Sequence, residues 1–265
     1  MSLRILTYNI LDGGIGREGF ILEVLQAVQP DVVILQEVFH LATVEQFATA
    51  LDMAFFFARG NSKRHLALLS RLPIVTSHTY RPFPPIHNCI LEATLEVAPE
   101  QQLYVFGVHL IAHPFVVFEL WRQWEVRTVL QRAKRYRSSP CLIAGDFNAI
   151  APNDPVIVKL WPRFLKLMLA LQGGRIFRKV IREVLSAGFT DCYRQLHSEK
   201  NGFTLPTPDP NVRLDYIFVN DVLIEHLRKC HVVREPATVD RASDHYPVMA
   251  EFKNASYDVT VLLSA

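Results

Sequence analysis

The sequence lacks most of the features that assign a chain to a class at once. Its 265 residues contain no linker rich in glycine, serine or proline, no low-complexity tract and no repeat. The net charge of +2 is too weak to indicate nucleic-acid binding by electrostatics alone. No uncharged apolar run approaches the roughly 20 residues that span a bilayer. These absences favour one globular domain.

Cysteine pairs are also missing. The chain has four cysteines with no C-x-x-C spacing: Cys89, Cys141, Cys192 and Cys230. We expect reduced, mostly buried thiols. The opening MSLRILTYNI passes directly into strand-like sequence, without the apolar core and cleavage site of a signal peptide. We therefore expect a cytoplasmic protein.

No glycine-rich phosphate loop follows the first strand-like run. Gly13, Gly14 and Gly16 lie near the right place, but a helix start in the G-x-G-x-x-G register is absent. A doubly wound nucleotide-binding fold is therefore disfavoured.

The chain does contain many short apolar runs, and 50% of its residues are hydrophobic. Nine strands are predicted, at residues 3–10, 31–37, 66–70, 74–80, 88–97, 102–110, 140–146, 213–219 and 247–253. Helical spacing predicts helices at 17–29, 43–51 and 115–136. The mixture predicts an α/β (α+β) sandwich of two mixed sheets covered by helices. We expect a single domain over 1–253, with a C-terminal tail at 254–265.

Polar side chains interrupt or end several of these apolar strands. Asp146 and Asn148 follow the run CLIAG, and the two-residue period of an extended chain would aim both the same way. The others are Asn9, Glu37, His109, Asp215, Asp244 and His245. A polar group in such a place must be paired, ligated or placed in a cleft to offset its desolvation.

Each of these residues alone also has a structural explanation. Asn9 fits turn chemistry at a strand end, Glu37 a solvated strand end, and His109 a hydrogen-bonded core histidine. Asp244 fits a cap or a turn. Asp215, inside an apolar strand, is harder to explain in this way.

Taken together and in order, the set resembles the endonuclease/exonuclease/phosphatase superfamily of metal-dependent phosphoesterases. The resemblance rests on TYNI, LQEV, LLSRLPI, GVHL, GDFNA, RLDYIFV and SDHYPV, spread from residue 7 to residue 248. It implies a four-layer α/β/β/α sandwich with an active site at one edge. It also implies hydrolysis of a phosphate ester by water with a divalent cation, usually Mg²⁺, for which Mn²⁺ can substitute.

By motif position, the resemblance implies three metal-binding residues. Glu37 would be the central ligand, with Asn9 beside it and Asp244 close to the same cation. Magnesium prefers oxygen ligands and keeps several waters, so a few carboxylates suffice. The absence of a Cys or His cluster argues independently against zinc.

The resemblance also implies the catalytic residues. Asp146 would position or deprotonate the attacking water, and Asn148 would orient it or hold the phosphate. Asp215 would pair with His245 and so favour its imidazolium form. His109 would contact the phosphate from the other side.

Arg213 lies two residues from Asp215 and shares its strand face. Contact with the substrate phosphate is one prediction for it, and a surface ion pair is the favoured one.

Two departures from the repair branch of the superfamily bear on the substrate. GVHL does not lead into the Y-x-P-N motif of apurinic-site enzymes, and GFTLPTPDPNVRLDY lacks their Trp-rich stretch. The chain looks more like the sphingomyelinase, phosphatase and deoxyribonuclease branches. We therefore expect a small or lipid-linked phosphate ester as substrate. A nuclease using the same site is the alternative, and a non-catalytic phosphate-binding module is a remote one.

The segment 156–182 carries seven basic residues and no acidic one: Lys159, Arg163, Lys166, Arg175, Arg178, Lys179 and Arg182. It begins a basic helical insertion over 156–187. One interpretation is a helical hairpin packed on the sandwich with a solvated basic face. The other is an apolar and basic lip that engages an anionic membrane surface, which would make the protein peripheral to the membrane. The same patch could grip a nucleic-acid backbone.

Overall fold

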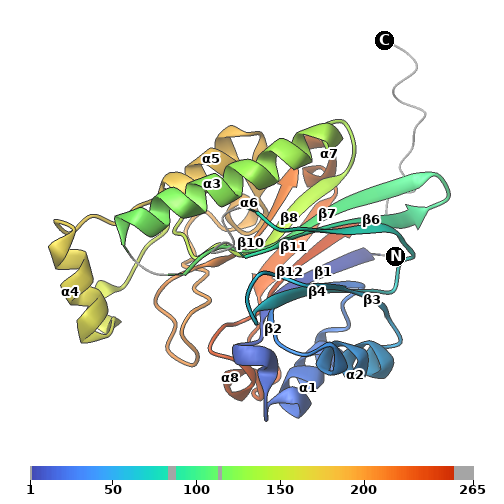
Figure 1. The fold of residues 1–265 in the computed structure, drawn as a ribbon, viewed down its shortest axis with the longest axis horizontal. Helices are drawn as coiled ribbons and strands as arrows, with labels where there is room; N and C mark the ends of the chain where they lie inside the picture. The colour runs from blue at the N-terminus through green and yellow to red at the C-terminus, as the bar shows by residue number, and fades with distance from the viewer. Residues whose placement is uncertain (1, 83–87, 113–114, 254–265) are drawn as a thin grey trace.

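A computed structural model describes residues 2–82, 88–112 and 115–253 (Figure 1). The predicted tail at 254–265 lies outside these residues. The described chain forms two six-stranded sheets flanked by helices, as the four-layer prediction requires.

The first sheet has the order β11-β12-β1-β2-β4-β3. Its strands, in chain order, are β1 (Ser2–Asn9), β2 (Val32–Val38), β3 (Ala54–Ala58), β4 (His65–Ser70), β11 (Leu227–Val232) and β12 (Val248–Lys253). β1 and β2 are parallel and the other pairs are antiparallel. The carboxyl ends of β1 and β2 therefore meet at one edge of this sheet.

The second sheet has the order β5-β6-β7-β8-β10-β9. Its strands are β5 (Ile74–Tyr80), β6 (Ile90–Ala98), β7 (Gln101–His109), β8 (Cys141–Asp146), β9 (Phe189–Asp191) and β10 (Asp215–Asn220). β7 and β8 are parallel, and β10 runs antiparallel to β8.

Three apolar clusters fill the space between the layers. The central one joins the inner faces of the two sheets, with Ile5 and Ile34 from the first sheet and Val105, Leu142 and Ile217 from the second, all fully or almost fully buried. The other two lie on the outer faces of the sheets, beneath the helices. Such continuous burial explains why the central strands read as unbroken apolar runs.

Helices cover the outside of both sheets (Figure 1). The first sheet carries α1 (Glu18–Val28), α2 (Leu41–Leu51) and the short α8 (Val239–Ala242), and the second carries α3 (Val116–Ala133) and α5 (Lys179–Ser186). Two further short helices are α6 (Cys192–Leu196) and α7 (Asp221–Ile224). None of the helices in the described ranges is long and apolar enough to cross a membrane.

The insertion after β8 splits into two helices of different character. α5 buries Val180, Ile181 and Val184 against the second sheet. α4 (Arg163–Leu171) buries none of its residues and projects from the sandwich (Figure 1). The interpretation of 156–182 as a packed hairpin therefore describes α5 and not α4.

Candidate active site

Three neighbouring strands of the second sheet carry a polar residue at the same level. His109 at the end of β7 is in register with Asp146 at the end of β8. Asp146 is in turn in register with Asp215 at the start of β10. Residues paired across neighbouring strands lie on the same face. One row across the sheet thus gathers a histidine and two carboxylates, all three buried.

The first sheet contributes Asn9 and Glu37 to the same place. Asn9, the last residue of β1, donates from Nδ2 to Asp146 Oδ2 at 3.0 Å, and its Oδ1 accepts from the backbone N–H of Leu11 at 3.0 Å. Glu37, near the end of β2, has φ of +60°, a left-handed conformation that costs free energy in a non-glycine residue. The ends of both sheets therefore meet in one polar cluster.

Asp146 is the centre of this cluster. Its Oδ2 lies 3.6 Å from Nε2 of His109 and 3.8 Å from Nε2 of His245. The Nε2 of His109 also lies 3.7 Å from Glu37 Oε1. Burial raises the pKa of the Asp146 carboxyl above its usual range, while the neighbouring His245 lowers it. A carboxyl with a raised pKa is suited to accept a proton near neutral pH.

Asn148 meets Asp146 through a turn and not through the pleat. β8 ends at Asp146, and Asn148 adopts φ of +45°. The backbone N–H of Asn148 donates to Asp146 Oδ1 at 2.8 Å, and its Nδ2 donates to the carbonyl of Leu110 at 2.9 Å. Nδ2 of Asn148 also donates to Asp146 Oδ2 at 3.3 Å, so the two side chains meet, but local Asx-turn chemistry brings them together.

Asp215 and His245 form a direct pair. Nδ1 of His245 lies 2.8 Å from Asp215 Oδ2, and both residues are buried. Burial alone would lower the pKa of the His245 imidazole, but the carboxylates of Asp215 and Asp146 raise it to about 10. His245 is thus a cation at neutral pH in the protein without bound metal, and its Nε2 faces Asp146.

Glu37 has two partners that the sequence did not point to. Its Oε2 accepts from the backbone N–H of Asp12 at 2.9 Å and lies 3.3 Å from Nε of Arg64. Arg64 also reaches Asp12 Oδ1 at 3.1 Å. Asp12 begins a short 3₁₀ helix (Asp12–Gly14) after β1, Arg64 directly precedes β4, and neither belongs to a recognisable motif. Their net of contacts holds the Glu37 carboxylate in place.

The donor set fits a hard divalent cation. Besides Glu37 and Asp146, the half-buried Asp244 belongs to the cluster, and its pKa is raised by burial and by the charge of Glu37, with His245 lowering it. Neighbouring carboxylates repel one another, and a bound cation would neutralise this repulsion. Oxygen ligands of this kind are those that Mg²⁺ prefers.

A second cluster could be considered for a cation. Asp146, Asp215 and His245 each place one ligand atom within 4.8 Å of the others. The short contact between His245 and Asp215 is, however, a hydrogen bond that holds a proton between them. Asp215 and His245 are thus engaged with each other, which makes this trio less suited to a hard cation.

Arg213 lies outside this cluster. Its guanidinium is buried and bonded to Asp154 at 2.6 and 3.0 Å and to Asp191 at 3.0 and 2.5 Å. All three of its nitrogens are engaged by carboxylates inside the protein. The predicted surface ion pair is therefore wrong, because the pair is internal, and the guanidinium is engaged by these carboxylates.

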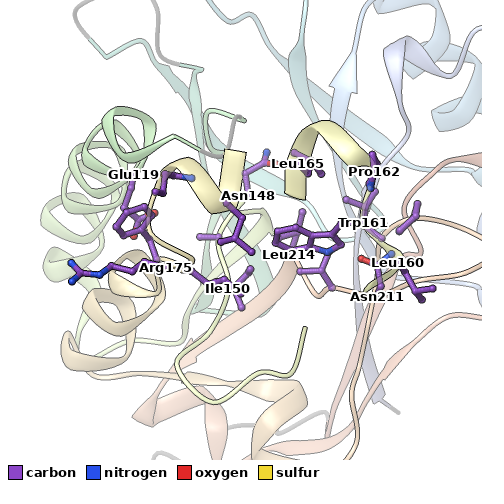
Figure 2. A pocket seen from close by; sticks show the side chains of 18 of the residues that line it. Glu119, Asn148, Ile150, Leu160, Trp161, Pro162, Leu165, Arg175, Asn211 and Leu214 are labelled. Atoms are coloured by element: carbon purple, nitrogen blue, oxygen red, sulfur yellow. The ribbon is translucent and has the colours of Figure 1, made fainter. Parts of the chain in front are cut away.

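A pocket of about 480 Å³ opens beside the cluster (Figure 2). Asn148 and Asp244 line one part of it, and Trp161 and Leu165, at and next to α4, line another. The candidate active site thus continues into a largely apolar cavity.

A model of the Endonuclease/Exonuclease/phosphatase family matches residues 6–245 of this chain. The match spans every residue of the polar cluster. No curated protein sequence matches the chain significantly.

Solved structures show the same fold. The 3′ phosphatase NExo from Neisseria, bound to a product DNA hairpin, is similar with a TM-score of 0.74 and 21% identity, covering 95% of this chain and 99% of that one. An AP endonuclease from Archaeoglobus fulgidus has a TM-score of 0.75 and 18% identity, covering 95% and 99%. TDP2 from D. rerio, complexed with a single strand DNA product, has a TM-score of 0.67 and 21% identity, also covering 95% and 99%.

Proposed function

Because this chain belongs to the endonuclease/exonuclease/phosphatase family, a family of metal-dependent phosphoesterases, we propose that it hydrolyses a small or lipid-linked phosphate monoester or diester. The observation that carries the proposal is the environment of Asp146. A buried carboxylate with a raised pKa lies beside two histidines and accepts hydrogen bonds from Asn9 and Asn148.

Magnesium is the proposed cofactor, with manganese as a substitute. Glu37, Asn9 and Asp244 would hold it, since each offers an oxygen atom and the charge of Glu37 acts on the Asp244 carboxyl. When bound, the ion would stabilise negative charge on the phosphate oxygens as a Lewis acid. The carbonyl oxygen of Asn9 retains a second lone pair for this purpose, because an amide oxygen has two.

Asp146 is the proposed general base. It would take a proton from the attacking water, and the hydrogen bonds from Asn9 and Asn148 would fix the direction of its carboxylate. Asn148 would also orient the water or hold the phosphate.

The two histidines would bind the phosphate. His245, kept cationic by Asp215, would donate from Nε2 to a non-bridging oxygen. His109 would contact the phosphate from the other side. Preorganised donors aimed at the developing charge typically supply a large share of the rate enhancement.

A nuclease is the second candidate. Its support is that two of the similar proteins, NExo and TDP2, are bound to a product DNA hairpin and to a single strand DNA product. Against it stands the weak net charge of +2, since binding to nucleic acid is dominated by phosphate contacts. A non-catalytic phosphate-binding module is disfavoured because every expected catalytic residue type is present.

A substrate screen tests the proposal. Purified protein with Mg²⁺ is assayed on phosphate monoesters and diesters, supercoiled plasmid and RNA, beside Asp146→Asn and the exposed control Asp52→Asn. We expect hydrolysis of at least one small or lipid-linked ester, lowered about 10²–10⁴-fold in Asp146→Asn and unchanged in the control. Hydrolysis of nucleic acid alone would favour the nuclease. Equal rates for Asp146→Asn and wild type would refute the assignment of the site.

A further inference from the structure

The pocket beside the active site has mostly apolar walls. Trp161 and Leu165 line it from α4 and the turn before it (Figure 2). Leu169 of α4 and Leu205 and Val212 of the loop before β10 line it as well. Its volume of about 480 Å³ is in the range of sites for small organic ligands. The mostly apolar walls favour a hydrocarbon group as the occupant.

The pocket is continuous with the catalytic cluster, because Asn148 and Asp244 line both. A molecule whose phosphate lies against these two residues can extend its remaining part between α4 and the facing loop. The shape therefore suits an ester that carries an apolar group next to the scissile phosphate.

The opposite face of α4 is apolar as well, and it is exposed to solvent. The exposed fractions are 62% for Phe164, 57% for Leu167 and 69% for Leu171, and Leu160 in the preceding turn is 54% exposed. Their spacing places them along one side of the helix. Contiguous exposed apolar side chains on a soluble domain mark an interaction surface.

The first turns of α3, which reach the pocket through other residues, also carry exposed apolar side chains. Val116, Val117 and Leu120 are 51%, 41% and 58% exposed. Glu119 and Arg122 from the same turns line the pocket wall and pair with each other at 3.2 Å. The mouth of the pocket is therefore flanked by exposed apolar side chains from two helices.

Charge identifies the partner of this surface. Around α4 the exposed Lys159, Arg163, Lys166 and Arg175 are all cationic, and 156–182 contains no acidic residue. A second copy of the chain would bring the same cations face to face, which opposes self-association. Exposed apolar side chains beside basic ones match the surface of a bilayer that contains anionic lipids.

Resting on the proposed function, we propose that α4 lies on an anionic lipid surface and that the pocket beneath it takes the hydrocarbon part of a lipid phosphate ester. The outer face of α4 enters the interface, its neighbouring cations contact lipid headgroups, and its inner face forms the pocket wall. The phosphate of the bound lipid then lies against Asn148 and Asp244.

Vesicle co-sedimentation tests the docking surface. Wild type, the variant Phe164→Gln/Leu167→Gln and the matched control Val75→Gln/Leu196→Gln, whose exposed apolar residues lie elsewhere, are pelleted with phosphatidylcholine vesicles with and without phosphatidylserine. We expect a clear preference for the anionic vesicles at low salt. We also expect partitioning to fall about tenfold or more in the α4 variant and to stay unchanged in the control, because two anchoring side chains lose their apolar contact.

Calorimetry of alkyl phosphates tests the pocket. Binding of methyl, butyl and hexyl phosphate to Asp146→Asn in Mg²⁺ is expected to tighten about two- to fourfold per added CH₂ group. Leu165→Trp in the same background, which fills the cavity, should flatten this dependence on chain length. Equal affinities for all three alkyl phosphates would overturn the assignment of the pocket.

The remaining outcomes separate this inference from the proposed function. Equal pelleting with neutral and anionic vesicles, or undiminished pelleting of the α4 variant, would overturn the docking surface. If the α4 variant lost binding to an oligonucleotide but kept its binding to vesicles, the surface would belong to nucleic acid. That result would also overturn the docking surface for lipid. Vesicle binding without hydrolysis of any ester would contradict the proposed function alone, because neither binding assay needs turnover.

Discussion

Asn9 and Asp146, 137 positions apart in the chain, are joined by a 3.0 Å hydrogen bond from the amide Nδ2 to the carboxylate Oδ2. The bond links the end of β1 in one sheet to the end of β8 in the other. It gives Asn9 two tasks under the proposed mechanism, because its nitrogen would orient the base while its oxygen, which also accepts from the backbone N–H of Leu11, would help to hold the proposed cation.

The substitution Asn9→Asp separates these two tasks. It keeps an oxygen ligand but replaces the amide donor by a second carboxylate beside Asp146. At saturating Mg²⁺ we expect kcat to fall about 10²-fold, whereas the Mg²⁺ concentration for half-maximal rate should not rise. Steady-state kinetics over a range of Mg²⁺ concentrations measures both. An unchanged kcat would show that the bond to Asp146 has no catalytic role.

The pairing of His245 with Asp215 predicts an unusual titration. In the metal-free protein the imidazole of His245 should titrate near pH 10, because Asp215 and Asp146 stabilise its cationic form more than burial opposes it. His245 should then stay charged at neutral pH and lose its proton only as the pH rises toward that value. Removing the Asp215 charge in Asp215→Asn should lower this pKa. Nuclear magnetic resonance of the labelled imidazole measures it, and an ordinary pKa near 6.5 in wild type would contradict the pairing.

Arg213 is predicted to matter for stability. Arg213→Met would leave the carboxylates of Asp154 and Asp191 buried without their main partner. We expect the free energy of unfolding to fall by about 3–5 kcal/mol. The control Arg127→Met removes an exposed pair with Glu183 and should cost no more than about 1 kcal/mol. Urea denaturation compares them, and similar losses would contradict the buried network.

Gly145 is predicted to be required by the close approach of β7 and β8. It has φ of +149°, and a Cβ atom there would lie 1.9 Å from the carbonyl oxygen of Val108. Gly145→Ala should therefore lower the free energy of unfolding by about 2 kcal/mol or more. Gly19→Ala, on the exposed side of α1 with open space around it, should not destabilise the protein. Equal changes in the free energy of unfolding for the two variants would mean that β7 and β8 can move apart at Gly145 without a cost in free energy.

Much of the fold could be read from the sequence because its strands are buried on both faces. The nine predicted strands all occur, with ends shifted by a few residues, and the long apolar runs of β2 and β8 are fully buried. β3, β9 and β11 were missed. β9 has only three residues, and β11 alternates less clearly because Arg228 and Lys229 both stay exposed.

The candidate site could be predicted as a set of residues but not as a geometry. Strand-end motifs identified Asp146, Asp215 and His245, which the structure brings together. The contact of Arg64 with Glu37 was not predicted, because an arginine in a loop has no periodic sequence pattern. Arg213 is held inside the protein by the carboxylates of Asp154 and Asp191, and only the fold brings these two residues close to it.

The helical insertion shows a similar limit. Trp161, Phe164 and Leu165 have a spacing that suggests one helix face, yet Leu165 lines the pocket while Phe164 is exposed. Sequence periodicity indicates that a helix is apolar. When both sides of the helix are apolar, it does not indicate which side packs against the rest of the protein and which side is exposed to solvent.

The central claim is that Mg²⁺ and Asp146 act together to hydrolyse a phosphate ester. The most direct measurement is the hydrolysis rate of the best ester from the screen, after chelation and during titration with Mg²⁺, for wild type and Asp146→Asn side by side. The account predicts that wild-type activity is lost with chelator and returns saturably with Mg²⁺, while the rate of Asp146→Asn stays about 10²–10⁴-fold lower at every concentration. A wild-type rate that survives chelation, or a variant that recovers with Mg²⁺ as wild type does, would contradict it.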